Sequence, residues 1–301
     1  MRLTHGRAAA LMVLVTLLWS IAGVVTRHLD AAASFEVTFW RSAFNALGLG
    51  IALHWMRGPA LWRGLAHSPW PVWVSGLCWS VMFTAFMVAL TLTRVANVLV
   101  TMALGPLITA LFARLFLHHK LALRTWAAIV VAGAGIGWMF SQGASANEAG
   151  ALAGIVVALA VPVAAAINWT VLQHVSHGND EAHDMLPAVL IGAVISSLVT
   201  LPLAAPFKAT PHDVALLGML GVVQLAIPCL LVVRLSRVLP APELSLLGLL
   251  EVIFGVLWAW WGAGEAPGTT ALTGGALVIG ALVANELVAL RSSARASEKR
   301  R

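Results

Sequence analysis

Charge is scarce in this sequence. Of its 301 residues, only 10% are Asp, Glu, Lys or Arg, while 60% are hydrophobic and the mean hydropathy is +0.91. A soluble domain carries about 25% charged residues. So few charges cannot cover a surface that faces water, which excludes a soluble globular protein. The composition therefore predicts an integral membrane protein.

Cysteine is scarce as well. Cys78 and Cys229 both fall in apolar runs, and two such residues exclude a disulfide framework or a cysteine metal site. We expect both to be reduced and to serve in packing. The histidines and aspartates of residues 174–184 fit a solvated link better than a metal site, so no metal is predicted.

Several catalytic and energy-coupling motifs are absent. The sequence contains no P-loop, no HExxH and no GxSxG. The GAGIG run at 133–137 lies in an apolar stretch with no strand before it, so it is not a dinucleotide loop. These absences argue against an enzyme, against a bound cofactor and against energy from ATP.

Long apolar runs dominate what is present. A helix that crosses a membrane needs about 20 mostly apolar residues. By that rule the sequence predicts an all-α membrane protein with ten transmembrane helices. They cover residues 8–26, 36–56, 70–92, 95–117, 123–141, 150–174, 185–204, 213–235, 241–262 and 270–290.

The basic residues indicate the orientation. With the N-terminus in the cytoplasm, 13 of the 18 Lys and Arg residues fall in cytoplasmic segments, as the positive-inside rule requires. We therefore expect a multi-pass protein of a bacterial-type inner membrane with both termini cytoplasmic. The net charge of +6 then reflects topology and does not indicate nucleic-acid binding.

The second half of the chain resembles the first. LLWSIAGVV aligns with INWTVLQHV, which places Trp19 opposite Trp169, and Gly105-Pro106 aligns with Glu251-Val252. The predicted repeats are residues 1–142 and 143–301. Five spans is an odd number, so the two repeats are inverted relative to each other. Inverted repeats are typical of transporters with a substrate site near the midplane.

Four segments together resemble a known family. They are LLWSIAGVVTR, VTFWRSAFNAL, VALTLTRVANVLVTMALGPLITALFARLFLHHKL and LLGLLEVIFGVLWAWWGAGE. In these the chain resembles the ten-helix branch of the drug/metabolite transporter superfamily, the EamA-like exporters. The resemblance implies export of a small metabolite, with amino acids as the leading class. The sequence departs from the family pattern at Val252, where proline is usual, and at Lys120, where glutamate is common.

Nine polar or aromatic residues lie near the middle of spans and are predicted to contact the substrate. The fifth and tenth spans offer only Gly and Ala there, so we expect them to be peripheral or to pack in a homodimer. The nine are Trp19, Arg41, Asn45, Trp79, Thr101, Asn168, Trp169, Gln224 and Glu251.

Each of these residues also has a structural interpretation. A charge at membrane depth costs roughly 3 kcal/mol or more, so Glu251 is a functional candidate by default, although it could instead bond backbone freed near a kink. Arg41, the cation closest to it in depth, could bind a carboxylate or extend to the interface. The tryptophans could be packing residues. Pro106, Pro162 and Pro228 each free a carbonyl four residues earlier, that of Met102, Ala158 and Gln224 respectively.

The combination favours a secondary transporter that exports a small amphipathic solute, such as an aromatic amino acid, with possible proton coupling. One alternative is a proton-coupled antiporter of lipophilic cations or drugs. A membrane-embedded enzyme or a structural scaffold fits less well, because no paired nucleophile and base can be assembled and a scaffold has no use for buried charges.

Overall fold

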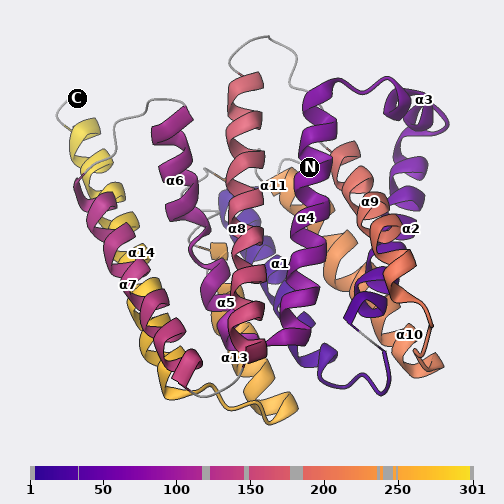
Figure 1. The fold of residues 1–301 in the computed structure, drawn as a ribbon. Helices are drawn as coiled ribbons and strands as arrows, with labels where there is room; N and C mark the ends of the chain where they lie inside the picture. The colour runs from indigo at the N-terminus through magenta and orange to yellow at the C-terminus, as the bar shows by residue number, and fades with distance from the viewer. Residues whose placement is uncertain are drawn as a thin grey trace.

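The computed structural model describes residues 4–32, 34–116, 123–145, 149–176, 186–235, 238–239, 247–248 and 250–298. The regular elements of these residues are all helices (Figure 1). They are α1 (His5–Thr26), α2 (Ser34–Arg57), α3 (Ala60–Ala66), α4 (Trp70–Leu92), α5 (Val95–Met102), α6 (Gly105–Phe116), α7 (Leu123–Ser145), α8 (Ala149–Ser176), α9 (Leu186–Ala204), α10 (Pro211–Met219), the π-helix η1 (Leu220–Ala226), α11 (Ile227–Leu235), α13 (Leu250–Ala263) and α14 (Thr269–Glu298).

Within the described residues these helices make ten passes, five in each half, which confirms the predicted fold class. Five segments are long and apolar enough to cross a membrane by themselves: His5–Thr26, Trp70–Leu92, Val95–Phe112, Leu186–Ala204 and Pro211–Val232. Four further helices contain shorter apolar stretches. The remaining pass, α2, is long but carries buried polar residues. Because each half has an odd number of passes, the second half begins on the opposite side.

Two passes are irregular near their prolines. The fourth is divided into α5 and α6 by a turn at residues 103–104, directly before Gly105-Pro106. The eighth contains η1 directly before Ile227-Pro228. A proline in a helix removes one backbone donor and pushes against the preceding turn, and both irregularities lie where that effect is expected. By contrast, α8 continues through Pro162.

The helices α7 and α14 lie side by side at one edge of the bundle (Figure 1). They approach closely at Gly135, where an added Cβ would lie 2.8 Å from the carbonyl oxygen of Gly274. Their outer faces carry exposed apolar side chains such as Val130 and Leu272. These two helices were predicted to be peripheral, and this is where the structure places them.

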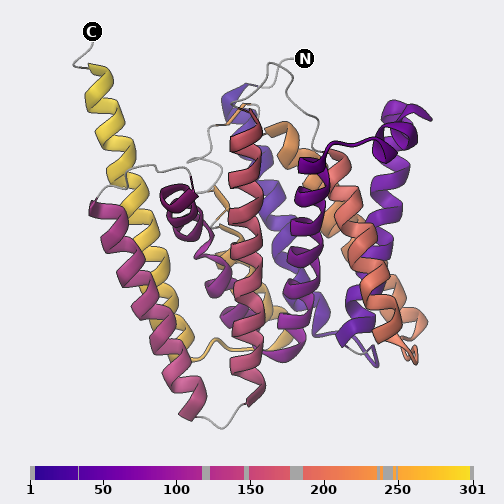
Figure 2. The same ribbon diagram turned by 45° about the horizontal axis from the view of Figure 1, so that its top comes forward.

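Both termini lie at one end of the bundle (Figure 2). We call the opposite end the far end. Two fully buried carboxylates fasten its links. Glu36 accepts hydrogen bonds from the backbone N–H groups of Lys208 and Ala209, at 2.8–3.1 Å. Asp213 caps α10 and accepts the backbone N–H groups of residues 30–32, at 2.7–3.1 Å. These hydrogen bonds hold the far-end links at residues 30–32 and 208–209 against α10 and α2 respectively.

Candidate functional site

Arg41 is the centre of a buried polar cluster formed by three helices. Only 2% of the residue is exposed. Its Nε and Nη2 both donate to Oε1 of Gln224, at 3.1 and 2.9 Å, and Nε2 of Gln224 donates to the carbonyl oxygen of Trp19 at 3.0 Å. The cluster thus joins α2, η1 and α1, and it contains three of the residues that the sequence predicted.

The π-helix brings Gln224 to Arg41. A π-helical turn is wider than an α-helical one and is often found at functional sites. It approaches α2 closely through Gly221, where an added Cβ would lie 2.6 Å from the carbonyl oxygen of Arg41 and 2.8 Å from the nitrogen of Asn45. Only a residue without a side chain permits this contact, so Gly221 is required for the approach that places the Gln224 amide beside Arg41.

The cluster keeps unsatisfied hydrogen-bonding capacity. In the described part of the chain, Nη1 of Arg41 has no hydrogen-bond partner, and neither do the amide nitrogen and oxygen of Asn45. Arg41 and Asn45 are one turn apart and therefore share a face of α2. Buried polar groups are nearly always paired, so unpaired ones need an explanation. The ring of Phe86 lies 5.5 Å from the guanidinium carbon of Arg41.

Glu251 lies in a separate cavity. This cavity has a volume of about 180 Å³ and is lined by Leu99, Met102, Ala103, Pro106, Gly248, Glu251 and Val252. It lies between the break of the fourth pass and the start of α13. It brings Pro106 close to Glu251 and Val252, the positions that the comparison of the two halves aligns. Among the described residues, no side chain forms a hydrogen bond or ion pair with the Glu251 carboxylate.

Arg41 and Glu251 are opposite charges in one membrane interior. The sequence predicted Arg41 to be the cation closest to Glu251 in depth, and the structure places the two residues in separate surroundings, the polar cluster and the cavity. No ion pair within 4.0 Å joins them in the part of the chain that the structure describes. Two charges that are separated in this way can each bind one end of a solute.

The structure places the other predicted residues in different surroundings. The Trp19 side chain packs in a cluster with Met12, Val15 and Leu235. Trp79 lies 5.4 Å from the Phe83 ring and packs between α4 and α9. The hydroxyl of Thr101 donates to the Asn97 carbonyl oxygen at 2.7 Å. Among the described residues, no hydrogen bond joins any of these three side chains to Arg41 or Glu251.

Two predicted residues belong to α8. Asn168 is buried, and its side-chain oxygen has no partner among the described residues. Trp169 follows it in the helix, and its side chain lies outside the described part. The importance of both for a substrate remains a prediction from the sequence.

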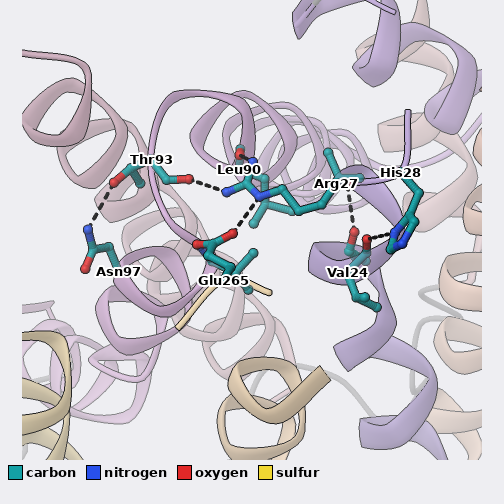
Figure 3. Close-up of polar contacts among 10 residues, drawn as sticks. Val24, Arg27, His28, Leu90, Thr93, Asn97 and Glu265 are labelled. Atoms are coloured by element: carbon teal, nitrogen blue, oxygen red, sulfur yellow. Dashed lines mark hydrogen bonds and ion pairs between the residues drawn. The ribbon is translucent and has the colours of Figure 1, made fainter. Parts of the chain in front are cut away.

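Sequence reasoning missed a polar cluster at the far end (Figure 3). Arg27 and Glu265 form an ion pair with 2.6 Å between Nε and Oε2. Both lie in predicted links, where charged residues are expected to be solvated. Arg27 follows directly on an apolar span and Glu265 follows three residues after one, which is the signal that could have drawn attention to them.

Comparison with known proteins supports the two-half architecture. The profile of the EamA-like transporter family matches residues 6–141 and 152–285, most of both halves. The chain belongs to the EamA-like transporter family. It is accordingly a multi-pass membrane protein of a family of transporters, not of enzymes.

A solved crystal structure of another protein shows the same fold. It superposes with a TM-score of 0.63 at 21% identity and covers 94% of this chain and 98% of its own. At this identity the likeness is one of fold alone. No curated protein matches the sequence.

Proposed function

We propose that the protein is a secondary transporter that exports a small metabolite with a carboxylate, such as an amino acid, across a bacterial-type inner membrane. The observation that supports this most is the buried Arg41, whose Nη1 has no partner among the described residues. A guanidinium binds carboxylates through paired, directional hydrogen bonds. The termini and the basic links face the cytoplasm in this proposal, and the far end faces outward.

A zwitterion matches the two charges. Its carboxylate would bind Arg41 beside the Asn45 amide, and its amine would bind Glu251. Phe86, which already lies near the guanidinium, supplies an apolar surface for an aromatic side chain. Each end of the solute would then compensate a charge that is costly in a membrane interior.

Proton coupling would depend on Glu251 in this proposal. The sequence has no P-loop, so energy must come from an ion gradient or from the solute's own gradient. A carboxylate without a hydrogen-bonding partner among the described residues can take up a proton when the solute leaves and release it when the next one binds.

A lipophilic cation is the second candidate substrate. The cavity at Glu251 is lined mainly by Leu, Met, Ala, Pro and Val, and such a surface with one carboxylate suits a cationic drug. The charge of Arg41 argues against a cationic substrate, because Arg41 would repel a second positive charge in the same membrane interior.

A thermal-shift panel on the purified protein separates the two candidates, because a ligand that binds the folded state stabilises it by mass action. The panel contains amino acids, the amines and the carboxylic acids that correspond to them, and lipophilic cations. We expect amino acids to raise the melting temperature, acids to raise it less, and amines and cations to have no effect. Stabilisation by cations alone would overturn the proposal.

A further inference from the structure

The polar cluster around Arg27 and Glu265 at the far end contains two preorganised donors that can bind an anion. Arg27 follows the last residue of α1 and is held by the end of α4. Its Nη1 donates to the carbonyl oxygen of Leu90 at 2.8 Å, and its Nη2 donates to that of Thr93 at 2.7 Å. The last carbonyls of a helix have no partner within the helix, so the guanidinium satisfies them. Arg27 is therefore fixed without any help from Glu265.

The amino end of α5 supplies the second half of this site. The backbone N–H of Val95, the first residue of α5, donates to the same carboxylate as Nε of Arg27. The start of a helix offers free N–H groups and a positive dipole end to an anion. We call Nε of Arg27 together with the N–H of Val95 the far-end cradle.

The carboxylate of Glu265 occupies the cradle. Its Oε2 accepts Nε of Arg27 at 2.6 Å, and its Oε1 accepts the Val95 N–H at 2.7 Å. This one carboxylate connects α1, the α4–α5 turn and the end of α13. It comes from a link and follows Gly264, whose φ of 65° is a conformation that favours glycine. A change of the Glu265 side-chain rotamer would empty the cradle, while Arg27 and Val95 would stay in place.

We propose that the far-end cradle is a second carboxylate site on the transport path. Glu265 fills it when the far end is closed, and the carboxylate of the solute replaces Glu265 during passage. The proposal rests on the proposed function, since it requires a solute with a carboxylate. The exchange keeps both donors of the cradle paired, because one carboxylate replaces another on them, and the displaced Glu265 carboxylate must then be hydrated. It also breaks the two hydrogen bonds that hold the segment after α13 to Arg27 and Val95, which loosens this part of the far end.

Chemical rescue of the purified Glu265→Ala protein tests the cradle directly. We expect this variant to melt at a lower temperature than the wild type. Sodium acetate should recover a concentration-dependent part of the loss, whereas sodium chloride at equal ionic strength and acetamide should not. The wild type should gain less from acetate than the variant does, because its cradle is filled and only Arg41 remains to bind a carboxylate. Amino acids that the wild type transports should rescue at lower concentration than acetate.

Two controls assign the rescue to the cradle. The double variant Arg27→Gln/Glu265→Ala lacks the guanidinium and should respond to acetate no more than the wild type does. Glu251→Ala removes a carboxylate that has no such donors among the described residues, and it should likewise respond no more than the wild type. If Glu265→Ala fails to fold, Glu265→Ser also empties the cradle and undergoes the same comparison.

The outcomes separate this inference from the proposed function. Equal responses to acetate and chloride, or rescue of the double variant, would overturn the cradle even if transport that depends on Arg41 is intact. Rescue by acetate in a protein that transports no carboxylate would instead overturn the proposed function, and with it the passage of solute through the cradle, while the carboxylate-binding geometry would stand.

Discussion

At the scale of single residues, Gln224 determines which atom of Arg41 is available. Its oxygen accepts two of the guanidinium N–H groups, so Nη1 remains for a ligand. In Gln224→Glu, a carboxylate of the same shape would neutralise Arg41. We expect this variant to fold at least as stably as the wild type and to lose its thermal shift with amino acids. An undiminished shift would show that Arg41 does not bind the solute carboxylate.

Glu251 gives a second prediction at this scale. Glutamine resembles a carboxylic acid that is always protonated, so Glu251→Gln should fold and bind but transport at a rate that no longer depends on pH. Solute binding should also stop releasing protons. The measurement is transport by proteoliposomes over a range of pH, with Glu36→Gln as the control, because Glu36 bonds a far-end link. An unchanged pH profile in Glu251→Gln would show that Glu251 does not carry the proton and serves only in packing.

Much of this residue-scale account was accessible from the sequence. The rule that polar residues in mid-span are functional selected Arg41, Asn45, Gln224 and Glu251. Their partners were not accessible, because contacts between helices leave no local pattern. The Arg27–Glu265 pair is 238 residues apart in the chain, and nothing near either residue indicates the other.

At the scale of elements, the contact between η1 and α2 positions the site. An added Cβ at Gly221 would lie 2.6 Å from a backbone oxygen of α2, whereas one at Gly218 would lie 3.5 Å from the ring of Phe44, an ordinary contact. Overpacking costs about 1–3 kcal/mol. We therefore expect Gly221→Ala to lower the melting temperature and to weaken solute binding, while Gly218→Ala changes neither.

Thermal unfolding in detergent, with and without solute, measures both effects. Equal melting temperatures for the two variants would mean that the close approach does not determine the geometry of the site. The sequence indicated a kink at Pro228 but not its form. The π-helix results from the fit of this segment to α2, a tertiary effect that local propensity does not contain.

At the scale of the whole molecule, the ten passes place both termini at one end and the far-end links at the other. We expect a cysteine at Lys208 to react with an impermeant maleimide added to intact cells, and a cysteine at Trp62 to react only after lysis. Both positions are exposed. The native Cys78 and Cys229 are buried, so the unaltered protein is an unlabelled control. Labelling of Trp62→Cys in intact cells would show that the protein has the opposite orientation to the one predicted.

The central claim is that a buried Arg41 recognises the carboxylate of a transported solute. Its most direct test is exchange of a labelled amino acid, the one that gives the largest thermal shift, across proteoliposomes that contain wild type, Arg41→Gln or Arg114→Gln. Arg114 is an exposed arginine of α6, so its variant removes the same charge outside the site. We predict exchange by wild type and Arg114→Gln, and loss of exchange in folded Arg41→Gln. Equal exchange by all three proteins would contradict the claim.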